Sequence, residues 1–403
     1  MNWKNWKMGT TKVKVSSKEF LNGEFDISPT LKRFNQKNDV FSRSLWDDSI
    51  DPKKFYASYD IANYAPKKSK GFDHWDFAFR NASWHITDFV GERNFSKNGK
   101  VEGFTDYYAT YTPSSPMKVE LESEEETTNR VKLAAKMFGA GMVGICKIDE
   151  RWVYSDNFSR KTQDSKKLDL PEGMKHAIML IIPMDFELSK TYPAALSGAA
   201  TGIGYTDGLT CANTLAQFIT NLGYNAIASL NDTALNIPMA IEAGLGEYGR
   251  HGLLITPKYG PNIRIAKVFT DLPLKDDVPI KFGVKEFCTV CKRCAKSCPV
   301  KAIPFDKPQS KPPNFSSHTG ITKWTINAEK CFKFWVGMNT DCAICIRVCP
   351  YNKDFSKWWH RIGIRFANSP FRKMVLSIDD IWRFGERVAT AKWWKKGIKR
   401  LNN

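Results

Sequence analysis

The sequence lacks any run of about 18 apolar residues, so no segment is long enough to span a membrane as a helix. It also lacks a recognisable signal peptide, because residues 1–10 are polar and contain neither an apolar stretch nor a pair of arginines. We therefore expect a cytoplasmic protein unless a leader is absent from this chain. Acidic residues are outnumbered 42 to 60 by basic ones. The resulting charge of +18 predicts an acidic partner, such as nucleic acid, an anionic membrane face or an acidic redox protein, with a solvated basic surface as the alternative.

Cysteine is almost absent outside one window. Eight of the ten cysteines lie between Phe287 and Pro350. The first run has the spacing C-x2-C-x2-C-x3-C-P, and the second run is C-x2-C-x3-C-P with one more cysteine upstream. These eight residues are Cys288, Cys291, Cys294, Cys298, Cys331, Cys342, Cys345 and Cys349. The first spacing is that of bacterial ferredoxins, and two such runs predict two 4Fe-4S clusters.

The spacing also predicts which cysteines share a cluster. A tight loop aims the first three thiolates of a run at one cage, and the fourth cysteine starts a helix that leads to the other cluster. One predicted set is Cys288, Cys291, Cys294 and Cys349, and the other is Cys298, Cys331, Cys342 and Cys345. Zinc knuckles or disulfides are the alternatives, but zinc ligands usually come as two pairs. The motif indicates electron transfer without identifying the final acceptor.

The chain divides into four predicted parts. Residues 1–122 are polar, aromatic and turn-rich, so we expect irregular structure with a few short helices, and core packing or a lid for the aromatic patch between Trp75 and Phe89. Residues 123–282 alternate helices and strands, which indicates an α/β (α+β) domain with a charged insertion at 149–175. Residues 283–352 form the predicted ferredoxin-like two-cluster unit, and residues 353–403 a basic tail.

Within the second part the expected elements follow from caps and periodicity. Ser123 precedes three glutamates, which predicts a capped helix ending near Gly139. Residues 197–222 are expected to be a small-residue loop running into a helix. The predicted strands cover residues 142–148, 177–183, 225–230, 253–256 and 263–269.

Gly244, Gly246 and Gly249 match the dinucleotide fingerprint G-x-G-x-x-G. The fingerprint should follow a strand and open a helix, whereas this copy follows a helical turn and leads into a strand. We therefore reject nicotinamide binding and interpret the glycines as a close approach of the backbone to something flat or bulky.

The tail is unusually basic and rich in tryptophan. From Tyr351 to the end there are 13 basic and 4 acidic residues, and five of the 13 tryptophans lie between Trp358 and Lys399. Basic amphipathic helices with tryptophan favour membrane interfaces. Packing onto the cluster unit is an equally good interpretation, and nucleic-acid binding is a third.

The segment from Asn231 to Thr270, followed by the two cysteine runs, resembles the corrinoid-dependent reductive dehalogenases. The matching text includes Asn231-Asp-Thr, Glu242-Ala-Gly-Leu-Gly-Glu, Gly252-Leu-Leu-Ile-Thr-Pro-Lys-Tyr-Gly-Pro and Lys281-Phe-Gly-Val-Lys-Glu-Phe-Cys288. The similarity covers residues 124–352. The resemblance implies a nitroreductase-like corrinoid-binding core beside a ferredoxin-like unit, two 4Fe-4S clusters and a base-off cobamide. No D-x-H-x-x-G stretch offers a histidine to cobalt, and the glycine loop would cradle the corrinoid.

The family's catalytic residues map by spacing onto Tyr205, Asn231 and Arg264. Tyr205 would donate a proton to the carbon that loses halide, Asn231 would orient the phenol, and Arg264 would lower the phenol's pKa. Without the resemblance, the three would be interpreted as a loop aromatic, a turn residue and a surface charge.

The resemblance also implies partners and a location. We expect an organohalide substrate, a low-potential electron donor and a small membrane anchor protein, with the chain at the outer face of the cytoplasmic membrane after export by a twin-arginine leader that is missing here. One alternative is an epoxyqueuosine reductase-like enzyme acting on tRNA. It is disfavoured by the long N-terminal region and the spacing of Tyr205, Asn231 and Arg264, so nucleic acid is an unlikely partner. The other is a non-catalytic electron carrier, which would not need the long region before the clusters.

Overall fold

A four-stranded antiparallel sheet forms the centre of the computed structural model, which describes residues 11–12, 16–62, 64, 66, 68–98, 115–159, 162–355, 357–367 and 369–402. Its strands in spatial order are β2 (Met142–Lys147), β5 (His176–Pro183), β9 (Ile263–Thr270) and β6 (Ala226–Ser229). Each begins and ends within one residue of its predicted range. All three pairings are antiparallel, so the core is of the α+β type.

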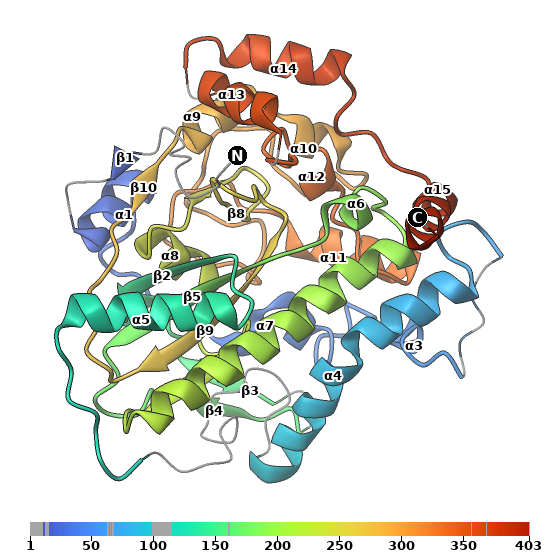
Figure 1. Cartoon of the computed structure of the whole chain (residues 1–403). Coiled ribbons are helices and arrows are strands. Elements are labelled where there is room, and N and C mark those ends of the chain that lie inside the picture. The colour runs from blue at the N-terminus through green and yellow to red at the C-terminus, as the bar shows by residue number, and fades with distance from the viewer. Residues whose placement is uncertain are drawn as a thin grey trace.

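Both faces of the sheet are buried because alternate side chains enter two different hydrophobic cores. On one face, Ile178 and Leu180 of β5 pack against α5 (Glu124–Met137) and α7 (Ala195–Asn221). On the other face, Met179 and Ile181 pack against α1 (Ser17–Phe25) and α8 (Asn236–Glu242). Figure 1 shows α5 and α7 together in front of the sheet. Helix α5 begins as predicted, since the Glu126 backbone N–H donates to Ser123 Oγ at 3.1 Å.

Two long helices replace structure that was predicted to be irregular. The N-terminal region contains α4 (His74–Asn98), and the expected loop from residue 197 is part of α7, which has 27 residues. The loop prediction was wrong because glycines in α7 permit close packing: a Cβ on Gly202 would lie 2.0 Å from Ser83 Oγ of α4. The two helices lie side by side (Figure 1), and their contact offsets the low helix propensity of glycine.

The other N-terminal elements cover the core and the cluster unit. They are β1 (Thr11–Lys12), η2 (Gln36–Asn38), α2 (Val40–Arg43) and α3 (Lys53–Ala57). Strand β1 pairs with β10 (Ile280–Lys281), and Phe55 of α3 packs on Phe332 of α11 (Ala328–Met338). The first third of the chain is therefore part of the main body in its described residues.

The insertion at 149–175 is more ordered than its charged sequence indicated. It contains η4 (Glu150–Trp152) and the ribbon of β3 (Asp156–Phe158) with β4 (Ser165–Lys167), and Trp152 is buried in the core. Helix α6 (Phe186–Ser189) follows β5. The strand predicted at 253–256 is β8 (Leu254–Ile255), which pairs with β7 (Glu247–Tyr248) outside the central sheet.

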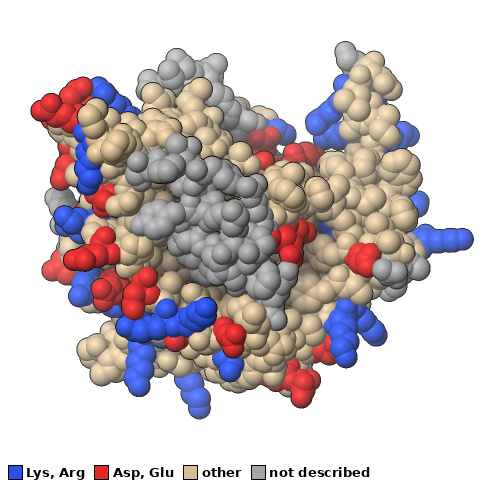
Figure 2. Space-filling view, turned by 90° about the horizontal axis from the view of Figure 1, so that it is seen from below, with Lys and Arg blue, Asp and Glu red and all other residues tan. Residues whose placement is uncertain are grey.

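The cluster unit and the tail complete the molecule. The cysteine runs lie around α9 (Val284–Val290), α10 (Arg293–Ser297), α11 and α12 (Ile344–Arg347). The tail forms α13 (Trp358–Ala367), α14 (Arg372–Ile381) and α15 (Thr390–Leu401). Among the described helices, none combines the length and apolar character needed to cross a membrane. On the face shown in Figure 2, basic and acidic side chains are interspersed, so the excess positive charge forms no continuous patch there.

Candidate active site

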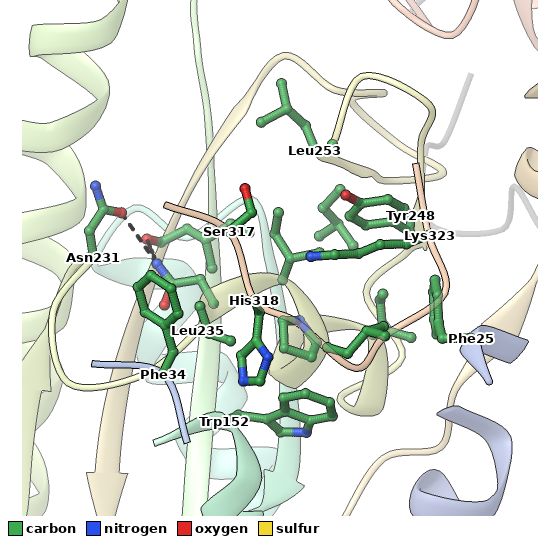
Figure 3. A pocket seen from close by; sticks show the side chains of 18 of the residues that line it. Phe25, Phe34, Trp152, Asn231, Leu235, Tyr248, Leu253, Ser317, His318 and Lys323 are labelled. Atoms are coloured by element: carbon green, nitrogen blue, oxygen red, sulfur yellow. Dashed lines mark hydrogen bonds between the residues drawn. The ribbon is translucent and has the colours of Figure 1, made fainter. Parts of the chain in front are cut away.

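A large cavity lies between the sheet, the N-terminal segments and the cluster unit. It holds about 1480 Å³ of empty space, including the part that opens to solvent. Figure 3 shows Asn231 at one end and Tyr248 with Lys323 at the other. The wall is mainly apolar and includes Leu21, Phe25, Phe34, Trp152, Leu235, Ile241, Leu253, Ile263, Ile265, Ile321 and Ile346.

Polar side chains of the segment 316–323 also line the cavity, among them His318 and Lys323. The ammonium end of Lys323 points towards the middle of the cavity (Figure 3), and burial lowers the pKa of this amine to about 8. The Nδ1 atom of His318 lies 2.7 Å from the Thr319 carbonyl oxygen, and burial lowers the pKa of the imidazole. The sequence analysis did not single out this segment, which lies between the two cysteine runs and carries no motif.

Tyr205, Asn231 and Arg264 lie together at one end of the cavity. They come from α7, from the turn after β6 and from β9. The amide Nδ2 of Asn231 donates a hydrogen bond to the Tyr205 hydroxyl oxygen, and the Arg264 guanidinium lies 5.3 Å from the centre of the Tyr205 ring. Asn231 and Arg264 line the cavity, whereas Tyr205 lies beside them with its ring stacked on Trp84 of α4, 4.8 Å between ring centres.

A chain of hydrogen bonds that starts at Lys267 orients the side chain of Asn231. The buried Lys267 ammonium donates to Asn236 Oδ1 at 2.7 Å, and Asn236 Nδ2 donates to Asn231 Oδ1 at 3.3 Å. The second bond orients the amide so that its N–H groups face Tyr205. Sequence reasoning missed Lys267 and Asn236, although a lysine inside the apolar strand β9 is an unusual feature.

Arg264 is connected to the cluster unit. Its Nη2 donates to Thr201 Oγ1 at 2.9 Å, and that hydroxyl donates to Asp341 Oδ2 at 2.6 Å. Asp341 is buried and immediately precedes Cys342 in the chain. The end of the cavity that holds Tyr205 is therefore tied to the loop of a predicted cluster ligand.

The three fingerprint glycines are not among the residues that line the cavity, and their expected role as a cradle for the cofactor stays a prediction. A Cβ on Gly244 would lie 2.3 Å from the Val278 carbonyl oxygen, and one on Gly246 would lie 2.3 Å from that of Ile255. Gly249 is tight against His251 and Ile255. The close approach that the glycines permit is to the protein's own chain.

The eight cysteines of the two runs gather in two places. Cys288, Cys291, Cys294 and Cys349 line one small cavity together with His251 and Tyr351. Burial raises the pKa of the Cys345 thiol, and the neighbouring Cys331, Cys342 and Cys298 raise it further. These are the two sets that the spacing predicts, although which atoms ligate each cluster stays a prediction.

The surroundings of these thiols fit iron–sulfur clusters. Burial raises the pKa of Cys331 and of Cys349 to about 12, so a bound cation is needed to hold them as thiolates at neutral pH. In the first cavity, His251 Nε2 and the Tyr351 hydroxyl are buried and have no hydrogen-bond partner among the described residues. Cluster sulfides accept such bonds. Ile346, which follows Cys345, lies in the wall of the large cavity, so the second set of thiols is the one beside it.

Comparison with known proteins identifies two parts of the chain and its fold. Residues 287–353 match the 4Fe-4S dicluster domain, so the protein carries a two-cluster iron–sulfur unit on an α+β core. Residues 155–274 match the reductive dehalogenase subunit model. The fold is similar to that of the catabolic reductive dehalogenase NpRdhA, with a TM-score of 0.72 and 20% identity over 94% of this chain and 49% of that one.

Curated relatives lead to the same family. The chain is 37% identical over 300 residues to a tetrachloroethene reductive dehalogenase of Desulfitobacterium hafniense, covering 65% of this chain and 54% of the relative. The enzyme of the same name from Sulfurospirillum multivorans is 32% identical over 297 residues, 67% of this chain and 59% of that one. An epoxyqueuosine reductase of Lactococcus garvieae matches 34% of this chain and 38% of its own length at 32% identity. This protein belongs to the reductive dehalogenase family, and it spans about half the length of the curated relatives it matches.

Proposed function

We propose that the protein is a reductive dehalogenase that removes halide from an organohalide. The reaction breaks a carbon–halogen bond, consumes a pair of electrons and a proton, and releases halide and the hydrogen-substituted product. The observation that carries the proposal is the hydrogen-bonded pair of Tyr205 and Asn231, with Arg264, at the end of a cavity that borders the cluster unit.

A corrinoid is the cofactor that we propose for this cavity. The mainly apolar wall suits a large flat ring system, and the polar groups of His318 and Lys323 can meet its peripheral amides and phosphate. The residues that would hold it lie in the N-terminal segments, in the chain from Tyr248 to Leu254 and in the segment 316–323. When bound base-off, the cofactor supplies low-valent cobalt for breaking the carbon–halogen bond.

Residues of the chain itself would supply the proton and stabilise the phenolate that its transfer leaves. Asn231 donates to the phenolic oxygen of Tyr205, which leaves the hydroxyl hydrogen available to a substrate carbon. After proton transfer, the same amide N–H and the Arg264 cation would stabilise the phenolate. The apolar wall would keep water away and strengthen both interactions.

Electrons would cross the protein in a fixed order. The set containing Cys345 borders the large cavity through Ile346, whereas the set containing Cys288 lies towards α13 and α14. We therefore propose entry at the cluster of Cys288 and exit from the cluster of Cys345. The family resemblance adds a low-potential electron donor, a small membrane anchor protein and export to the outer face of the cytoplasmic membrane.

Replacing Tyr205 with phenylalanine tests the proposal. Loss of the proton donor should lower the rate of halide release by about 10²–10⁴-fold while the cluster spectra stay unchanged. Tyr224→Phe is the matched control, because that hydroxyl donates to the Val119 carbonyl oxygen away from the cavity. Equal rates in Tyr205→Phe and the wild type would refute the assigned role.

A further inference from the structure

Helices α13 and α14 expose an apolar stripe each. On α13, large apolar side chains at positions 358, 359, 362 and 366 recur at helical spacing, and all are at least two-fifths exposed. On α14 and its flanks the corresponding positions are 371, 374, 378, 381 and 382, and Ile381 is 74% exposed. The nine residues are Trp358, Trp359, Ile362, Phe366, Phe371, Met374, Ile378, Ile381 and Trp382.

These stripes are not needed to hold the two helices on the protein. The opposite faces of the helices already pack against the cluster unit, where Ile364, Ala367, Val375 and Leu376 contact the core around Phe287. Between the stripes runs a groove of about 880 Å³, including its open side, which Ile362, Phe366, Met374 and Ile378 line. Figure 1 shows α13 and α14 at the edge of the molecule beside α9. An apolar surface of this kind marks an interaction site.

The charges around the stripes are predominantly positive. Residues 357–383 contain six lysines or arginines and two aspartates. Asp379 is buried against Arg293 and Lys353, and Asp380 pairs with Arg293, so both carboxylates are neutralised locally. Lys357, Arg365, Lys373 and Arg383 are exposed. The surface therefore combines apolar side chains, three tryptophans and a cationic rim.

We propose that this α13–α14 face binds the surface of an anionic lipid bilayer. Tryptophan rings and aliphatic side chains enter the boundary between headgroups and acyl chains, while the rim cations meet lipid phosphates. The cationic rim complements an anionic lipid surface, and the basic and aromatic composition of the face favours lipid over an apolar protein partner.

The α13–α14 face lies next to the predicted cluster of Cys288 and Cys349. Phe287 and Tyr351 line both the groove and the cavity of Cys288 and Cys349. A protein that lies on the bilayer through α13 and α14 has this cluster as the nearer one to the lipid. Only the direction of electron flow rests on the proposed function, because lipid binding itself does not depend on catalysis.

Co-sedimentation of the full chain with protein-free vesicles tests the proposal. Binding is expected with vesicles of phosphatidylcholine and phosphatidylglycerol, and it should weaken with salt and in vesicles of phosphatidylcholine alone. The triple variant Ile378→Ser, Ile381→Ser and Trp382→Ser should bind at least about tenfold more weakly. Leu133→Ser with Met137→Ser is the matched control, because these exposed residues lie on α5.

Halide release with a soluble electron donor separates this proposal from the proposed function. The triple variant should release halide at the wild-type rate, whatever its vesicle binding. Equal binding of the triple variant and the wild type would overturn the lipid contact. A second result would also overturn it: the wild type does not bind vesicles of pure lipid, but it binds membranes that contain protein, and the triple variant does not.

Discussion

At the scale of single residues, the hydroxyl of Tyr205 is oriented through a chain of buried polar groups. Lys267 donates to Asn236, Asn236 donates to Asn231, and Asn231 donates to the phenolic oxygen. Each donor is fixed by the one behind it, so the phenol is held in a defined position before substrate arrives. Asn236 and Lys267 are positioning residues in this account, because they act on the phenol only through Asn231.

Replacing Asn236 with alanine tests the chain. We expect about a tenfold lower kcat, because Asn231 loses the bond that orients its amide. Made in a Tyr205→Phe background, the same substitution should have no further effect, since no hydroxyl remains to be oriented. An equal loss in both backgrounds, measured as halide release, would show that Asn236 has only a structural role.

Glu242 provides a residue-scale prediction on stability. Its carboxyl is 3% exposed and accepts a hydrogen bond from Trp152 Nε1 at 2.9 Å, and burial raises its pKa from 4.5 to about 7. Between these two values the folded state keeps a proton that the unfolded state releases, so the free energy of unfolding falls as pH rises from about 4.5 to about 7.

The variant Glu242→Gln keeps the acceptor and removes the titration. Its stability advantage over the wild type should be small at the acidic end of that window and grow to about 3 kcal/mol above it, measured as thermal unfolding across the pH range. Glu172→Gln, at an exposed position, is the matched control. A stability difference between Glu242→Gln and the wild type that does not change with pH would contradict the account.

At the scale of elements, the contact between α4 and α7 sets the position of Tyr205. Trp84 of α4 stacks on Tyr205 of α7, and Gly202 brings the two helices close enough for this stacking. A Cβ at position 202 would lie 2.6 Å from Trp84 Cδ1. The glycine therefore positions the proton donor as well as the helix.

Gly202→Ala should push the helices apart. Overpacking at this contact is expected to cost about 1–3 kcal/mol and to lower halide release, because Tyr205 and Trp84 both move. Gly397→Ala on α15 is the control, since no atom lies within 4 Å of its added Cβ, and it should leave stability unchanged or raise it by about 0.5–1 kcal/mol. Unchanged melting and activity in Gly202→Ala would rule out the close contact.

The sheet and helix α7 show which elements can be predicted from sequence patterns and which cannot. The four strands of the sheet were predictable because their apolar runs are local. Helix α7 was mistaken for a loop in its first part because glycine opposes helix formation unless another element packs against it, and that element lies more than a hundred residues away.

At the scale of the whole molecule, the site is assembled from distant segments. The eight cysteines were predictable because the chemistry of a cluster fixes their spacing. The cavity wall was not, because it joins α1, α8, β9, the segment 316–323 and α12, which lie far apart in the chain. Tyr205, Asn231 and Arg264 were found through the family resemblance, and the structure places them together.

Metal analysis combined with halide release tests the central claim most directly. The chain would be reconstituted anaerobically with iron, sulfide and a cobamide, and supplied with reduced viologen and a panel of haloalkenes, haloalkanes and halophenols. The account predicts about eight irons and a stoichiometric amount of cobalt per chain, with halide release that Tyr205→Phe slows by about 10²–10⁴-fold. A full complement of iron without bound cobalt, or bound cobalt without halide release from any substrate in the panel, would contradict it.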